Sequence, residues 1–81
     1  LAVDTDIEQR FRETITRQVG QNLKAARASA NMTQVELAKK IGTTQKQITR
    51  YETGEQDMTI ARMREIEIAL GAKFGTLIKG I

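Results

Sequence analysis

Residues 33–51 read TQVELAKKIGTTQKQITRY, and this stretch decides the fold. Thr33 and Glu36 have the spacing of a capping box, in which the threonine hydroxyl accepts an amide hydrogen bond and the glutamate returns one. Apolar residues then recur at helical spacing up to Ile41. Gly42 can adopt the left-handed conformation that ends a helix. The sequence therefore predicts a short helix that begins at Thr33 and ends before Gly42.

A second capped helix, about 45–53, follows after almost no linker. Thr44 and Gln47 have the spacing of another capping box, and Ile48 and Tyr51 give this helix a buried face. Two such helices cannot lie side by side and must cross at a large angle, so the stretch predicts a helix-turn-helix. The outer face of the second helix offers amide, hydroxyl and cationic groups, which suit base edges in a major groove: Thr44, Gln45, Lys46, Thr49 and Arg50.

This stretch resembles the Cro/cI-type (XRE family) DNA-binding domain of lambdoid phage repressors. The likeness rests on Thr33-Gln-x-Glu-Leu-Ala-x-Lys-x-Gly-Thr-Thr-Gln45 and extends over about residues 19–78. It implies an all-α fold: a compact five-helix lambda-repressor-like domain at 15–81, preceded by a helical extension at 1–14. It also implies sequence-specific binding of a double-stranded DNA operator by a homodimeric, repressor-like transcriptional regulator.

In the resembled repressors, the positions of Thr44, Gln45, Lys46 and Arg50 read bases, and that of Gln34 contacts the DNA backbone. Base reading is expected from the outer face of the second helix, namely Thr44, Gln45, Lys46, Thr49 and Arg50. Phosphate contacts are expected near the start of the motif and at nearby basic positions, namely Gln34, Thr33, Thr43, Lys24 and Lys39. The resembled repressors have Gln at the last two reading positions. Because Lys46 and Arg50 stand there instead, the preferred site should lean toward guanine.

The resemblance also implies an ion pair between Arg27 and Glu52 that ties the first helix to the third; the alternative is two unrelated surface charges. The loop 55–57 departs from the family because it is acidic at both ends, where related repressors often carry basic residues. We therefore expect few phosphate contacts from this loop and a reliance on dimerisation for affinity.

Composition narrows the function. The chain has 81 residues, enough for one small domain, and neither Cys nor His. We expect no disulfide, metal, cofactor or enzymatic activity, a cytoplasmic location, and no membrane segment. The net charge is +3, and residues 10–50 hold nine bases against two acids, as a DNA-facing surface requires. Because the chain begins at Leu1 without Met, we expect it to be trimmed or part of a longer protein.

The first helical pattern covers about Thr5 to Ala28, with a capping box formed by Thr5 and Glu8. Gly20 interrupts it at a cost of about 1 kcal/mol relative to Ala, so it predicts one long helix or two pieces. Apolar residues recur every fourth position: Ile7, Phe11, Ile15, Val19 and Leu23. The first three need a cover, either their own domain near the C-terminal helix or a second subunit.

Two further helices are predicted after the motif. One opens at Thr59 and ends at Gly71, and a short one covers about residues 73–78, weakened by Gly75. Met32, in the connection before the motif, should fill the core. The expected inner face of the fourth helix comprises Ile60, Met63, Ile66, Ala69 and Leu70. The expected inner face of the last helix comprises Phe74, Leu77 and Ile78.

Three classes of function remain in competition. The first is a DNA-binding regulator, whether a phage-type repressor, a stand-alone regulator or an antitoxin that represses its own operon; a toxin or effector-domain partner stays open. The second is a protein-interaction module that has lost DNA binding, although the basic outer face lacks the aromatic anchors such a surface uses. The third, an enzyme, has no catalytic constellation in its favour.

Overall fold

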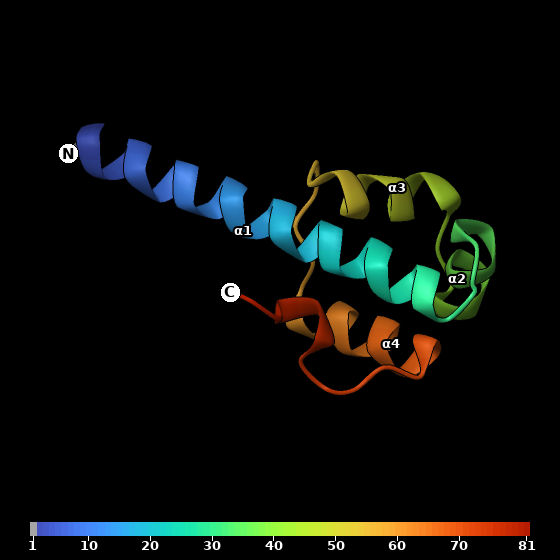
Figure 1. The fold of residues 1–81 in the computed structure, drawn as a ribbon. Coiled ribbons are helices and arrows are strands. Elements are labelled where there is room, and N and C mark those ends of the chain that lie inside the picture. Colours follow the sequence, from blue (N-terminus) through green and yellow to red (C-terminus); the bar gives the residue numbers. More distant parts are fainter. Residues whose placement is uncertain (1) are drawn as a thin grey trace.

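In a computed structural model, which describes residues 2–81 and the side chains of residues 6–81, the chain folds into helices alone (Figure 1). The helices are α1 (Ala2–Ser29), α2 (Gln34–Ile41), α3 (Gln45–Thr53) and α4 (Ile60–Leu70), followed by a 3-10 turn, η1 (Thr76–Ile78). In Figure 1, α3 lies along one side of α1, while α4 and the C-terminal segment lie along the other. The all-α prediction is confirmed.

α1 is one continuous helix, so the alternative of two pieces is wrong. It begins at Ala2, ahead of Thr5, and therefore the predicted capping box at Thr5 does not start it. Gly20 does not break the helix. A Cβ at Gly20 would lie 2.4 Å from the carbonyl oxygen of Tyr51 and 2.7 Å from that of Glu52. The missing side chain lets the backbone of α3 approach α1 closely.

The core lies where α1, α2, α3, α4 and η1 converge. Its eight buried apolar residues come from all five elements: Val19, Leu23, Leu37, Ala38, Ile48, Tyr51, Ile66 and Leu77. Met32 is half-buried and packs against this core, as predicted. Because the core draws on both sides of α1 and on both helices of the motif, it fixes α3 relative to the rest of the chain.

Local chemistry sets the ends of α2 and α3. Both halves of the capping box at Thr33 and Glu36 are formed, and Gly42 has a left-handed φ of 71°. Thr44 caps α3 by accepting from the amide of Gln47 at 3.1 Å. The return bond from the Gln47 side chain is not made, so the second capping box is only half formed. The predicted range of α3 is confirmed.

The fifth helix was predicted wrongly. Its place is taken by η1, held by the buried carboxylate of Glu67, which accepts from the amides of Gly75 and Leu77 at 3.1 Å each. Leu77 is buried as expected, but Phe74 is 77% exposed and Ile78 51% exposed. Gly75, at a φ of 90°, turns the chain too early for a helix that would bring all three inward.

α4 also differs from its prediction at one end. Thr59 is its cap and Gly71 ends it, as expected, and Ile66 is fully buried. Ile60 does not lie on the inner face, because it is 81% exposed in the first turn of the helix. Instead Arg62 binds α2, donating from Nη1 to the carbonyl oxygen of Ile41 at 3.1 Å. This bond satisfies a carbonyl at the C-terminal end of α2.

The N-terminal part of α1 extends past the other helices and gives the molecule dimensions of 44 × 24 × 19 Å (Figure 1). Every residue from 6 to 14 is exposed, and burial begins at Ile15. Ile7 is 57% exposed and Phe11 61% exposed, so their own domain does not cover them. No helix within residues 2–81 is both long and apolar enough to cross a lipid bilayer.

Candidate nucleic-acid interface

α3 presents two faces of opposite character. Ile48, Tyr51 and Glu52 face the core and are buried. The other face is exposed over more than one turn and carries the predicted base-reading residues: Thr44 at the cap, then Gln45, Lys46, Thr49 and Arg50. A short helix with one buried stripe and one polar, exposed stripe has the form that fits a major groove.

Gln34 links two of these exposed residues to the body of the protein. Its side-chain oxygen accepts from Nε2 of Gln45 at 3.3 Å and from the hydroxyl of Thr49 at 3.1 Å. Its own Nε2 donates to Oε1 of Glu52 at 3.0 Å. A residue predicted only as a phosphate contact therefore also orients Gln45 and Thr49 on α3.

Arg27 and Glu52 form the buried end of this chain of contacts. Nε of Arg27 lies 2.7 Å from Oε2 of Glu52, and Nη2 lies 3.1 Å from Oε1, which gives two parallel hydrogen bonds. The two side chains are only 16% and 5% exposed. The hydrogen bond to Glu52, aided by its charge, raises the pKa of Arg27. Arg27 also donates to the carbonyl oxygen of Met32 at 3.0 Å, so it holds the connection before α2 as well.

Lys46 and Arg50 are the two cationic residues of α3, and neither forms an ion pair with another described side chain. Both are exposed. Long cationic side chains without an internal partner lose no existing contact when they meet a base edge or a phosphate. They are therefore the residues on the exposed face of α3 that are most available to a ligand.

The start of α2 offers backbone donors. The capping box uses the amide of Thr33, which donates to Oε1 of Glu36 at 2.9 Å, and the amide of Glu36, which donates back to Thr33. Hydrogen bonding of the Glu36 carboxylate to the amide and to the hydroxyl of Thr33 lowers the pKa of Glu36. The amides of Gln34 and Val35 remain without an intrahelical acceptor, as first-turn amides do. Such amides at a helix N-terminus suit a phosphate oxygen.

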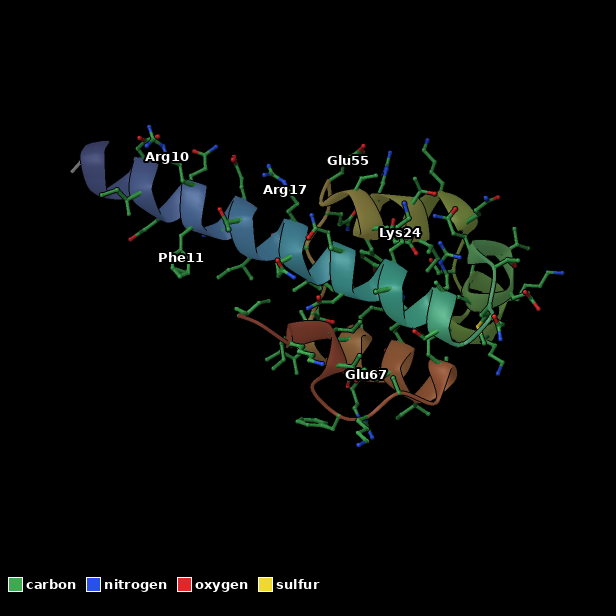
Figure 2. The ribbon with its side chains drawn as sticks, viewed as in Figure 1. Arg10, Phe11, Arg17, Lys24, Glu55 and Glu67 are labelled. Carbon is green, nitrogen blue, oxygen red and sulfur yellow. The ribbon has the colours of Figure 1, made fainter. Side chains whose placement is uncertain are left out.

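The remaining predicted phosphate contacts lie outside this network. Thr43 is half-buried, and its amide donates to the carbonyl oxygen of Ala38 at 2.8 Å. Lys39 is exposed in the last turn of α2, and Lys24 is exposed on α1. Figure 2 shows Lys24 and Arg17 on the side of α1 that faces α3.

Arg17 was not among the DNA contacts predicted from the sequence. It is exposed, and a Cβ on Gly54 would lie 3.1 Å from its Cα, so α1 passes close to the end of α3 at this point. The available signal was its spacing: Arg17 stands seven residues before Lys24 and so shares its face of the helix.

The acidic loop after α3 is exposed at Glu55 and Asp57. Asp57 accepts a hydrogen bond from the hydroxyl of Thr16, which fastens the loop to α1. The two carboxylates therefore remain beside the C-terminal end of α3, where they disfavour a phosphate.

Comparison with known families agrees with this geometry. A family model described as helix-turn-helix matches residues 23–77, more than half of the chain. The match begins at Leu23, in the last quarter of α1, and ends at the buried Leu77 in η1, so it includes α2, α3 and α4 in full. No curated protein was found to match the chain.

Proposed function

The chain belongs to the helix-turn-helix family of DNA-binding domains, and we propose that it reads double-stranded DNA sequence-specifically with α3 in the major groove. The observation that carries this proposal is the exposed polar face of α3, with Gln45 and Thr49 oriented by Gln34 and the two exposed cations of α3 beside them. Oriented amides and free cations are the groups that distinguish base pairs from the major groove.

Gln45 and the two cations would read different bases. Nε2 of Gln45 has a second hydrogen besides the one given to Gln34, so it can donate to N7 of adenine while its oxygen accepts from N6. Lys46 and Arg50 can donate to O6 and N7 of guanine. At the helix mouth, Thr44 can meet a thymine methyl group or a phosphate. We therefore expect a half-site that contains guanine.

The DNA backbone would be held at the start of α2. The amides of Gln34 and Val35 and the remaining N–H of the Gln34 side chain suit one phosphate. Lys24, Lys39 and the hydroxyl groups of the motif would add weaker contacts. Because Glu55 and Asp57 disfavour phosphate near the end of α3, we expect a shallower dependence of affinity on salt than a basic loop would give.

One domain reads only a few base pairs, so we propose that a homodimer binds two half-sites about one helical turn apart. The regulator would act as a repressor by occupying an operator. An antitoxin with a toxin as partner would use the same DNA-binding surface, and so it remains the alternative within this class.

Selection of binding sites from a random double-stranded oligonucleotide pool tests the proposal. We expect a guanine-containing half-site, repeated with two-fold symmetry. Lys46→Ala should weaken binding to that site, whereas Lys73→Ala, which removes the same charge from an exposed loop beyond α4, should leave it nearly unchanged. Failure to enrich any site would instead favour a protein-interaction module, whereas equal losses for the two variants would show that Lys46 contributes only its charge.

A further inference from the structure

The N-terminal part of α1 carries an apolar ridge formed by Ile7, Phe11 and Ile15. Each residue follows the previous one by four positions, so the three side chains lie along one face of the helix. Ile7 and Phe11 are more than half exposed, whereas Ile15 is half-buried and packs against the core of its own domain. The N-terminal turns of α1 are exposed over this face, and helical turns without tertiary contacts are marginally stable in water. A partner that packs on the ridge would therefore stabilise them.

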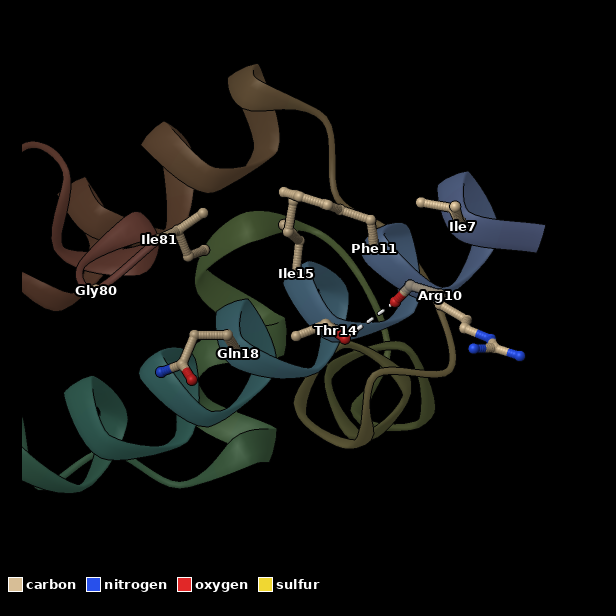
Figure 3. Close-up of a pocket in the computed structure, with 8 residues that line it drawn as sticks. All are labelled: Ile7, Arg10, Phe11, Thr14, Ile15, Gln18, Gly80 and Ile81. Carbon is tan, nitrogen blue, oxygen red and sulfur yellow. Dashed lines mark hydrogen bonds between the residues drawn. The ribbon is translucent and has the colours of Figure 1, made fainter. Parts of the chain in front are cut away.

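A hollow lies on each side of this ridge. One, of about 570 Å³, is bounded by Gln18 and by Ile81 from the C-terminal segment (Figure 3). The other, of about 440 Å³, is bounded by Asp57 from the loop after α3. The ridge residues line both hollows. A ridge along one face of a helix can pack against the same ridge of a second molecule, with like hollows meeting on each flank, which is the self-complementarity of a two-fold interface.

The charges beside the ridge are also self-complementary. Glu8 and Arg12 both line the second hollow, so they lie on the same flank of the ridge. A two-fold axis perpendicular to two antiparallel helices brings this flank of one copy against the same flank of the other. With Phe11 at the axis, Ile7 faces Ile15 of the second copy, and Glu8 comes within reach of the second copy's Arg12. On the other flank, Arg10 is already paired with Asp6 at 2.9 Å.

We propose that the occupant of this ridge is a second copy of the chain, packed antiparallel through Ile7, Phe11 and Ile15 with Glu8 opposite Arg12 of the second copy. The inference deepens the proposed dimer, on which it rests, by assigning its interface. Gly20, where α3 touches α1, is nine residues from Phe11, or two and a half turns, and so faces the opposite side of α1. A copy seated on the ridge leaves α3 uncovered.

Sedimentation equilibrium of the chain without DNA tests the apolar part of the interface. Phe11→Ser should raise the dimer dissociation constant roughly tenfold or more, because an aromatic anchor at the centre of an interface is lost. Phe74→Ser is the control, since Phe74 is also mostly exposed, 77% against 61% for Phe11, but lies beyond α4; it should leave dimerisation unchanged. Far-ultraviolet circular dichroism should show that both variants keep their helices. A monomeric parent chain, or equal effects of the two variants, overturns the proposal.

Charge exchange tests the antiparallel pairing. Glu8→Arg and Arg12→Glu should each dimerise more weakly than the parent chain, because each places like charges across the interface. A mixture of the two variants should recover tight association as a heterodimer. Recovery excludes an unrelated protein or a small molecule as the natural occupant, and failure to recover overturns the antiparallel arrangement. Because these measurements contain no DNA, their failure is distinguishable from failure of DNA reading, which a single half-site in a mobility-shift assay reports separately.

Discussion

Gln34 donates to the same oxygen of Glu52 that accepts from Nη2 of Arg27, at 3.0 Å and 3.1 Å respectively. One buried carboxylate thus joins α1 to the first residue of α2, and Gln34 carries the connection onward to Gln45 and Thr49 on the exposed face of α3. The groups that hold the fold together and the groups proposed to read DNA therefore belong to one continuous set of hydrogen bonds.

Replacing Gln34 tests that continuity. Gln34→Ala should weaken binding to random DNA because a phosphate contact is lost. It should weaken binding to the preferred site further, because Gln45 and Thr49 lose the oxygen that orients them. Fluorescence anisotropy on both DNAs measures the two effects. Gln9→Ala, which removes an exposed amide from α1, is the control. Equal losses on the two DNAs would show that Gln34 contacts only the backbone.

Direct base reading predicts a different pattern. Gln45→Ala and Arg50→Ala should each cost about 1–3 kcal/mol on the selected site while barely changing the affinity for random DNA. Lys79→Ala removes an exposed charge from the C-terminal segment and should change neither affinity. If the Gln45 and Arg50 variants lose the same amount of affinity for both DNAs, these side chains contact phosphates rather than bases.

The buried ion pair between Arg27 and Glu52 should contribute more to the free energy of unfolding than the exposed ion pairs do. Arg27→Ala leaves the carboxylate of Glu52, only 5% exposed, without its cation and should cost roughly 3 kcal/mol or more. Glu52→Ala should cost a similar amount because it also removes the acceptor used by Gln34. Urea unfolding of both single variants and the double variant gives the coupling energy, and a value below about 0.5 kcal/mol would mean two independent charges.

The cap of α2 should weaken in acid. Hydrogen bonds from Thr33 favour the charged form of Glu36 and lower its pKa in the folded protein. The stabilisation is therefore complete above the ordinary pKa of glutamate and is lost as the pH falls through the lower, folded-state pKa. Glu36→Gln removes this titration. Thermal unfolding of both proteins across the acid range should show their stability difference shrinking as the pH falls; a constant difference would contradict the assignment.

Local rules predicted the motif well. The caps at Thr33 and Thr44, the left-handed Gly42 and the bounds of α3 follow from residues that lie within one turn of each other. The face of a helix that turns inward also follows from periodicity, which is why Ile48 was assigned correctly.

Periodicity shows which residues share a face of a helix, but it could not show whether another element of the domain packs against each of them. Ile60 and Phe74 have the right spacing for the core, yet both are mostly exposed, and the group that lies over the ring of Phe74 is the guanidinium of Arg64, 5.2 Å from its centroid. The contact of Gln34 with Glu52 joins positions 18 residues apart, and no local pattern marks it. The sequence predicted that Gly20 would weaken α1. Its actual role depends on contact with the backbone of Tyr51, which is distant in sequence and could not be foreseen from local patterns.

α1 is a single helix in shape, but its exposure changes abruptly at Ile15. From there on, amide hydrogens can exchange with solvent only when the core residues around Val19 and Leu23 separate, so their protection should approach that of global unfolding. Between residues 6 and 14 the same backbone hydrogen bonds have no such cover and should open locally, many times faster. One unbroken helix therefore contains a boundary between two rates of exchange, and association with a second copy would move that boundary toward the N-terminus.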